Sequence, residues 1–342
     1  MGRDKVLVTG ATGFIAKWCI VSLIEAGYEV RGTARSRARA GAVGAAIASQ
    51  GVDPSRLELV EADLLSDAGW TEAAQGCRAV LHVASPFSLA PPRNRDDAIR
   101  PAREGTLRVL NAAAAAGVER VVLTSSVVAV IYPSGQPQSR TYDEADWTDP
   151  ERADITPYIA SKTLAERAAW EFAKTTGRPQ WLSVVNPGLV LGPALDRDIS
   201  ASHEVLTRMA SGQYPAVPAI GYPIVDARDV ADAHLRAMTT EAAGGERIIA
   251  AEGYLTLMEL GRLLSLTRPN LRWRLPWFAM HDATVRLGSR IDRRLRSALP
   301  DLGAVRSVRN DKARHLLGMR FHSAEDAAVR AIHSLNSLGL VR

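Results

Sequence analysis

The sequence predicts an α/β protein, with a doubly wound parallel sheet and a smaller C-terminal part. Apolar segments alternate with helical segments over residues 1–186, as in chains that wind helices onto both faces of a sheet. The apolar segments are nearly continuous, which is typical of parallel strands buried on both faces. The 342 residues exceed a minimal doubly wound domain by roughly a hundred, so a second, smaller part is expected.

The predicted elements follow in a regular order. Strands, which are β-branched and apolar runs between turn residues, are expected at 5–9, 29–33, 57–62, 79–84, 119–124 and 180–186. Helices, which are runs of helix-forming residues between Gly and Pro, are expected at 13–26, 69–76, 97–116 and 158–176. After Pro187 the prolines become frequent and the pattern loosens, although residues 246–266 still predict a strand followed by a helix.

A glycine-rich turn follows the first predicted strand. Gly10, Gly13 and Ala16 form the pattern Gly-x-x-Gly-x-x-Ala at the start of the first helix. Gly10 permits the tight turn, Gly13 lets the backbone approach a pyrophosphate, and Ala16 allows close helix–strand packing. Because a helix N-terminus offers N–H donors to phosphates, this context predicts dinucleotide binding rather than an ordinary strand–helix turn.

The end of the second predicted strand indicates which dinucleotide is bound. Folds that prefer NAD place an acidic residue there to accept from the ribose hydroxyls. This chain instead has Arg35, Arg37 and Arg39, while Glu29 comes too early. A guanidinium can bind a 2′-phosphate with paired hydrogen bonds, so NADPH is expected over NADH, with Arg35 as the first choice. The alternative is a solvated basic loop.

Tyr158 and Lys162 lie four residues apart in a predicted helix and therefore share one face. A phenol has a pKa near 10, and a neighbouring ammonium favours the phenolate and lowers that pKa. The pair is what a proton donor to a carbonyl oxygen needs. On its own it also fits a solvated helix face, so the glycine-rich turn in the same domain carries much of the inference.

Seven motifs in order resemble the extended branch of the short-chain dehydrogenase/reductase superfamily, over nearly the whole chain. Within that branch the similarity is closest to the dihydroflavonol reductase-like and aldehyde or ketone reductase group. The motifs are TGATGFIA at 9–16, LHVASPF at 81–87, VVLTSSVVAV at 121–130, YIASK at 158–162, VVNPGLVLGP at 184–193, VDARDVADAH at 225–234 and DKARHLLGMRF at 311–321.

The resemblance implies how the chain is divided. It implies a Rossmann-type NADP-binding domain over residues 1–186, to which later segments around 225–251 return. Residues 187–342 would form the smaller substrate-binding region, which is not an independent domain.

The resemblance also implies three catalytic residues. Tyr158 would protonate the carbonyl oxygen, Lys162 would lower the tyrosine pKa and hold the nicotinamide ribose, and Ser126 would hydrogen-bond the same oxygen. Ser125 competes with Ser126, because successive side chains at a strand end point to opposite faces. The family alignment favours Ser126. In the alternative, both hydroxyls satisfy local backbone groups.

The cofactor would be NADP(H), held largely at the carboxyl edge of the sheet. Asp63 matches the family residue at the adenine edge, although it also fits a turn or cap carboxylate. The expected cofactor-binding residues are Gly10, Thr12, Gly13, Phe14, Ile15, Arg35, Asp63, Leu64, Ala84, Lys162, Pro187 and Val190.

Phe87, Val127 and Tyr132 are the candidate substrate-pocket residues, with the segment around Leu189 and Val190 beside them. They suggest an apolar pocket rather than one lined for sugar hydroxyls or a nucleotide diphosphate. Each of them also fits an ordinary core position.

The predicted function is NADPH-dependent reduction of an aldehyde or ketone to an alcohol, and the reverse oxidation. One alternative is another enzyme of the same superfamily, either a sugar-nucleotide epimerase or dehydratase or a hydroxysteroid dehydrogenase. The other is a non-catalytic NADP-sensing protein. The retained Tyr–Lys pair and the arginine-rich loop favour the reductase.

The charge, the apolar runs and the cysteine spacing of the sequence indicate which classes of partner and which cell compartment to expect. The net charge is only +5, and the basic stretch around 286–296 predicts an amphipathic surface helix with a solvated face, so no nucleic-acid partner is expected. No signal peptide or apolar run of membrane-spanning length is present, which predicts a cytoplasmic protein with no membrane partner. Cys19 and Cys77 lack metal or redox spacing, so reduced thiols and no metal are expected. The oligomeric expectation is a monomer or homodimer.

Overall fold

The computed structural model describes residues 4–86, 94–135 and 139–341. Its central sheet has seven strands, all parallel, in the order β11-β7-β5-β4-β1-β2-β3. The bounds are β1 Lys5–Val8, β2 Glu29–Ala34, β3 Leu57–Glu61, β4 Ala79–His82, β5 Arg120–Thr124, β7 Leu182–Pro187 and β11 Arg247–Ala250. The predicted doubly wound fold is confirmed. The strand order reverses at β1, and such a switch point is where α/β sheets bind ligands.

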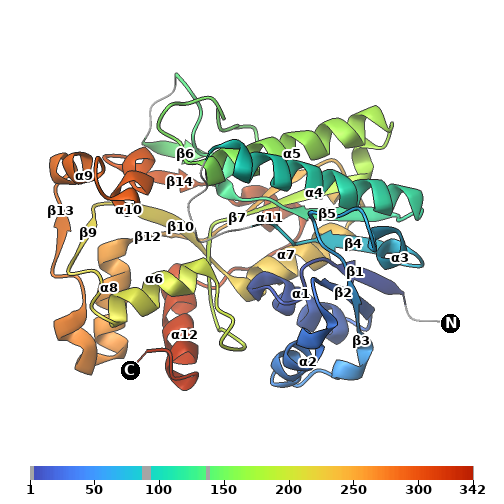
Figure 1. Cartoon of the computed structure of the whole chain (residues 1–342), viewed down its shortest axis with the longest axis horizontal. Helices are drawn as coiled ribbons and strands as arrows, with labels where there is room; N and C mark the ends of the chain where they lie inside the picture. Colours follow the sequence, from blue (N-terminus) through green and yellow to red (C-terminus); the bar gives the residue numbers. More distant parts are fainter. Residues whose placement is uncertain (1–3, 87–93, 136–138, 342) are drawn as a thin grey trace.

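Helices cover both faces of this sheet (Figure 1). The α4 and α5 helices lie over one face, and α1 and α7 pack together on the other. Each face has its own apolar core, for example Ile20 with Val230 on one side and Val109 with Ala169 on the other. The helix bounds are α1 Phe14–Glu25, α2 Ala40–Ala48, α3 Trp70–Ala74, α4 Asp96–Ala115, α5 Pro157–Thr175, α7 Ala227–Thr239 and α11 Asp311–Leu316.

A smaller part lies beside the carboxyl edge of the sheet (Figure 1). Its core packs Leu206, Leu260 and Ile332 from three helices against a three-stranded sheet. These helices are α6 Ala201–Ala210, α8 Leu257–Thr267 and α12 Ala324–Ser337, and the strands are β8 Leu189–Leu191, β10 Gly221–Asp226 and β12 Tyr254–Thr256. Two strand pairs join distant segments: β9 Ala216–Pro218 with β13 Phe278–Met280, and β6 Arg140–Tyr142 with β14 Arg306–Val308.

The chain crosses between the two parts more than once. After β8 and α6 in the smaller part, α7 packs on α1 and β11 extends the central sheet beside β7. The β12 strand and α8 then return to the smaller part. The strand and helix predicted within residues 246–266 are therefore split between the two parts, since β11 and β12 belong to different sheets.

Several elements of the structure were not predicted, and two differences concern the segments 40–48 and 286–296. The α2 helix was not predicted, because its Gly- and Ala-rich sequence lacks an apolar stripe of helical period. The single amphipathic helix predicted around residues 286–296 is wrong. Two short helices stand there, α9 Asp282–Gly288 and α10 Arg293–Ser297, and Ile291 between them is 91% exposed.

Candidate active site

The glycine-rich turn lies at the carboxyl end of β1, in the middle of the sheet. Gly10 adopts a left-handed backbone with a φ of +69°, and a Cβ atom there would lie 3.0 Å from the Cβ atom of Ala84, which follows β4. The N–H of Gly13 donates to the carbonyl of Gly10 at 2.8 Å. Glycine avoids the strain and the close contact that a side chain would meet at position 10, so the glycine pattern has a local structural cause.

The first turn of α1 faces this same edge. Gly13 precedes the helix in an extended conformation, and no side chain caps the helix. Thr12 and Ile15 are half-buried, while Phe14 is buried with its ring edge-on to His203 at a centroid distance of 4.5 Å. The uncapped N–H groups of the first turn can therefore donate to an anion such as a pyrophosphate.

Thr9 and His82, which sequence reasoning missed, join the ends of β1 and β4. The Oγ1 atom of Thr9 lies 2.8 Å from Nδ1 of His82 and accepts from the N–H of Ala84 at 2.9 Å. Burial lowers the pKa of His82 to about 3, and the positive charge of Lys162 adds to the effect. The imidazole is therefore neutral, and its role is to hold the edge of the sheet where Gly10 and Ala84 meet.

The arginine-rich loop follows β2, as predicted. Arg35 is exposed and comes directly after the strand, and no acidic side chain stands at the strand end. Arg39 pairs with Asp198 at 3.0 Å, so it is already engaged. Of these two arginines, Arg35 is the one whose guanidinium is open to a ligand.

Asp63 and Leu64 follow β3, next to the end of β2. The Oδ1 atom of Asp63 accepts from the N–H of Leu65 at 3.0 Å, which is the turn role that the sequence left open for it. Leu64 is 8% exposed and packs on Gly105 of α4. Both residues lie at the predicted edge, and Leu64 also belongs to the core.

The α5 helix positions the Tyr–Lys pair. The Oγ1 atom of Thr156 accepts from the N–H of Ile159 at 3.3 Å, and Pro157 occupies the first helical position, so the helix start is well defined. Tyr158 therefore stands in the first turn with 38% of its surface exposed, and Lys162 lies one turn further on, half-buried.

The ionisation of this pair differs from the sequence-based expectation. Although 38% of Tyr158 is exposed, desolvation of its phenol raises the pKa, and a hydrogen bond with the Ser126 side chain works against that rise. Burial lowers the pKa of Lys162 to about 8, opposed by the charge of Glu166. The expected lowering of the tyrosine pKa is therefore not found in the protein without cofactor, because desolvation of the phenolate dominates.

The two serines after β5 have different partners. Oγ of Ser125 donates to Oε2 of Glu166 at 2.5 Å, within the core. Ser126 instead lies beside Tyr158, and its Oγ is 3.5 Å from the carbonyl oxygen of Pro187 at the end of β7. The geometry therefore brings Ser126 to Tyr158 and directs Ser125 away from it.

The candidate pocket residues are placed differently from the catalytic ones. Phe87 lies outside the described residues. Val127 and Tyr132 are 3% and 2% exposed, and the Tyr132 hydroxyl donates to Oδ1 of Asp301 at 2.8 Å. Both occupy core positions, the alternative that the sequence left open. Val190 in β8 is 8% exposed.

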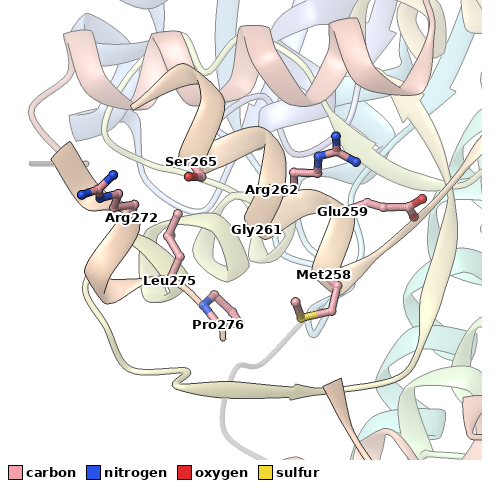
Figure 2. A pocket seen from close by; sticks show the side chains of 8 residues that line it. All are labelled: Met258, Glu259, Gly261, Arg262, Ser265, Arg272, Leu275 and Pro276. Atoms are coloured by element: carbon pink, nitrogen blue, oxygen red, sulfur yellow. The ribbon is translucent and has the colours of Figure 1, made fainter. Parts of the chain in front are cut away.

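One cavity adjoins the candidate site and another lies apart from it. The first, of about 20 Å³, is lined by residues that include Lys162, Ser125 and Glu166. A larger surface hollow of about 410 Å³ lies between α8 and the turn Pro269–Arg274, with Arg262 and Arg272 on its rim (Figure 2). The larger hollow contains none of the predicted site residues, so it is not the candidate active site.

The residues at the sheet edge fit a dinucleotide. A side chain at Gly10 would be strained and would crowd Ala84, and the first turn of α1 is uncapped. Among the described residues, the side chain of Lys162 has no hydrogen-bond or ion-pair partner, so its ammonium is free to bind a ribose. Within the same described part of the chain, no cluster of His, Cys, Asp or Glu could hold a metal ion.

Known proteins resemble this chain in sequence. Residues 6–251 match the profile of the NAD dependent epimerase/dehydratase family. The chain is 39% identical over 271 residues to cinnamoyl-CoA reductase 1 of Petunia hybrida, covering 76% of each chain. It is 30% identical over 347 residues to the ketoreductase azaE of Aspergillus niger, covering 97% of each.

A solved structure resembles the whole chain. The yeast methylglyoxal/isovaleraldehyde reductase Gre2, crystallised with NADPH, matches with a TM-score of 0.79 at 27% identity, covering 98% of this chain and 100% of that one. The predicted superfamily is confirmed. The chain has the glycine turn and the Tyr–Lys pair, and its residues 6–251 match the family profile. It therefore belongs to the NAD-dependent epimerase/dehydratase family, within the extended short-chain dehydrogenases/reductases.

Proposed function

We propose that this protein is an NADPH-dependent reductase that converts an aldehyde or ketone to an alcohol, and catalyses the reverse oxidation. The proposal rests mainly on one observation. The side chains of Ser126 and Tyr158 are hydrogen-bonded next to Lys162, at the edge of the sheet where the glycine turn lies. The relatives add support, since cinnamoyl-CoA reductase, a ketoreductase and Gre2 all carry reductase names.

The proposed chemistry divides the work among three side chains. NADPH, when bound, supplies the hydride to the carbonyl carbon. The hydroxyl of Tyr158 donates its proton to the carbonyl oxygen, and the hydroxyl of Ser126 donates a hydrogen bond to the same oxygen. The ammonium of Lys162 binds the ribose and stabilises the phenolate that remains on Tyr158. The raised pKa of Tyr158 keeps the phenol protonated at neutral pH, as reduction requires.

The proposed coenzyme preference rests on the end of β2. Arg35 is exposed where an acid would accept from the ribose hydroxyls of NADH. A guanidinium there favours the 2′-phosphate of NADPH, and Gre2 was crystallised with NADPH. Gly10, Thr12, Gly13, Phe14 and Ile15 would bind the pyrophosphate side of the cofactor.

The partner is proposed to be a small carbonyl or alcohol compound, with no nucleic acid involved. No helix in the described residues is long and apolar enough to cross a membrane. A cytoplasmic location and a monomeric or homodimeric state stay as predictions.

The experiment is a panel of aldehydes and ketones assayed by NADPH absorbance. Stoichiometric NADPH consumption with formation of the alcohol supports the reductase. The family description also covers epimerases and dehydratases. Substrate turnover without net NADPH consumption would establish that alternative, and NADPH binding without any turnover would establish a sensor.

A further inference from the structure

Glu166 is a buried carboxylate one helical turn beyond Lys162, and it is not one of the three proposed catalytic residues. Only 1% of its surface is exposed. Its two oxygens accept hydrogen bonds from four side chains: Oε2 from Ser125 Oγ at 2.5 Å and Asn186 Nδ2 at 2.8 Å, and Oε1 from Arg247 Nε at 2.6 Å and Trp170 Nε1 at 3.3 Å.

This hydrogen-bond pattern identifies Glu166 as an ionised carboxylate. The amide of Asn186, the guanidinium of Arg247 and the indole of Trp170 present N–H groups that can only donate. N–H donors on both oxygens, one of them from a guanidinium, stabilise the ionised form of a carboxylate. Paired with Arg247 at 2.6 Å, Glu166 therefore acts as a buried negative charge.

Arg247 neutralises part of this charge and is itself held firmly. Its Nη1 atom donates to the carbonyl oxygens of Glu144 and Asp146 at 2.9 and 2.6 Å. Its guanidinium carbon lies 3.7 Å from the ring centroid of Trp147. The ion pair thus ties α5 to β11, while Ser125 extends the network to β5.

Lys162 and Glu166 both line the cavity of about 20 Å³, which is large enough for one water molecule. The ammonium has no hydrogen-bond or ion-pair partner among the described residues, although burial lowers its pKa to about 8. His82 on β4 is neutral, and α4 contributes only the non-titrating Ala102 and Thr106 to the cavity lining.

The other charged groups around this pair do not replace Glu166. Tyr158, one turn before Lys162, has a raised pKa and is a neutral phenol. Arg247 donates to Oε1 of the carboxylate and has the same charge as the ammonium. Of the groups placed around Lys162, Glu166 is the one that favours its charged form.

We propose that Glu166 is a positioning residue that keeps Lys162 protonated at neutral pH and thereby sets the alkaline limit of carbonyl reduction. This inference rests on the proposed function for its link to catalysis. Its physical content is independent of that function: the charge of Glu166, rather than its hydrogen bonds, controls the ionisation of Lys162.

The lysine ionisation can be measured directly, because the sequence contains only five lysines. Selective ¹³C labelling of lysine gives five side-chain signals in an NMR pH titration of the folded protein without cofactor. The Lys162→Arg variant assigns the signal of Lys162. We expect this signal to titrate near pH 8 in the wild type and at least one pH unit lower in Glu166→Gln.

Two matched variants separate charge from structure. Glu166→Asp keeps the charge but shortens the side chain, so Lys162 should titrate closer to the wild type than in Glu166→Gln. Arg247→Met breaks the same network but removes a cation, so the pKa of Lys162 should stay or rise. Asp232→Asn, which removes an acid paired with Arg236 on α7, should change nothing.

The same variants test the link to catalysis. The pH above which kcat/KM for reduction falls should also be lower in Glu166→Gln than in the wild type, because Lys162 would lose its proton at a lower pH. If the wild type reduces no carbonyl compound, the proposed function fails while the NMR titration still decides the role of Glu166.

An unchanged Lys162 titration in folded Glu166→Gln would overturn the proposal. So would an equal downward shift in Glu166→Gln and Arg247→Met, because that pattern marks a purely structural network. If Glu166→Gln does not fold, the double variant Glu166→Gln/Arg247→Met removes both charges of the pair. A wild-type titration in that protein would equally reject the proposal, and a lowered pKa would support it.

Discussion

At the residue scale, the candidate site depends on a phenol that stays protonated and on an ammonium close to its titration point. Burial raises the pKa of Tyr158 and lowers that of Lys162 to about 8. Both shifts have the same cause, since desolvation penalises the charged form of each group. Tyr158 is therefore suited to donate a proton in the reductive direction.

Replacing Tyr158 by Phe removes the proposed proton donor and keeps the ring. We expect kcat for reduction to fall by at least a few hundred-fold, within or above the usual range for acid–base catalysis. The affinity for NADPH, measured by fluorescence titration, should barely change. Near wild-type turnover in Tyr158→Phe would contradict the assignment.

Arg35→Ala tests the coenzyme preference. It removes a charge-assisted contact of roughly 1.5–3 kcal/mol, so KM for NADPH should rise about ten- to a hundred-fold. KM for NADH, which lacks the 2′-phosphate, should change little. Arg39→Ala is the matched control, because Arg39 already pairs with Asp198. Equal weakening of both coenzymes in Arg35→Ala would mean that the preference lies in Arg37 or elsewhere.

At the element scale, α5 carries the reaction and its start sets the position of Tyr158. Thr156 caps the helix, Pro157 fixes its first backbone angle, and Tyr158 follows directly. Further along α5, the side chains of Ala169 and Ala173 pack in the apolar core of the sheet face that α5 covers. The helix is therefore held both at its end and along its buried face.

Thr156→Ala should both destabilise α5 and disturb the chemistry. Loss of the cap costs about 1 kcal/mol, seen as a lower Tm, and kcat should fall because the first turn frays. Ser323→Ala is the control, since Ser323 caps α12 away from the site and accepts from the N–H of Asp326 at 3.1 Å. It should lower Tm similarly but leave kcat unchanged. If kcat is also unchanged in Thr156→Ala, the cap does not position Tyr158.

At the scale of the whole molecule, the two faces of the sheet and the smaller part each have a separate apolar core. Buried histidines are built into this framework as neutral groups. In His234, Nδ1 donates to the carbonyl of Val230 at 2.7 Å, so Nε2 accepts from the hydroxyl of Thr124 at 2.6 Å. Burial lowers the pKa of His234 to about 4.

This histidine predicts a loss of stability in acid. Its ordinary pKa is near 6.5, so between pH 6.5 and 4 the unfolded chain binds a proton that the folded chain does not. The free energy of unfolding therefore decreases as the pH is lowered through this range, by up to about 1.4 kcal/mol per pH unit from this group. Urea unfolding at several pH values should give a shallower slope for His234→Gln. Burial raises the pKa of Asp301 to about 6, so this carboxyl group increases stability as the pH is lowered. It is present in both the wild type and His234→Gln, so it does not affect the comparison. Parallel slopes would contradict the prediction.

Much of the framework was predictable because its signals are local. Continuous apolar runs predicted strands that agree with β1 to β5 and β7 within about two residues at each end, since buried parallel strands need no alternation. Gly10 indicates a left-handed turn, and the four-residue spacing of Tyr158 and Lys162 indicates that they share one face of a helix. Each of these inferences depends only on residues that are close in the chain.

The sequence by itself thus determined the sheet, the glycine turn and the Tyr–Lys pair, because short-range geometry dictates all three. Only the tertiary structure decided which serine contacts Tyr158, because Ser125 donates its hydrogen bond to the buried Glu166 instead. It also placed Arg247, 81 positions along the chain from Glu166, beside that carboxylate. Contacts of this range arise when β11 joins the central sheet, and burial, which shifts the pKa of Tyr158 and Lys162, exists only once the chain has packed.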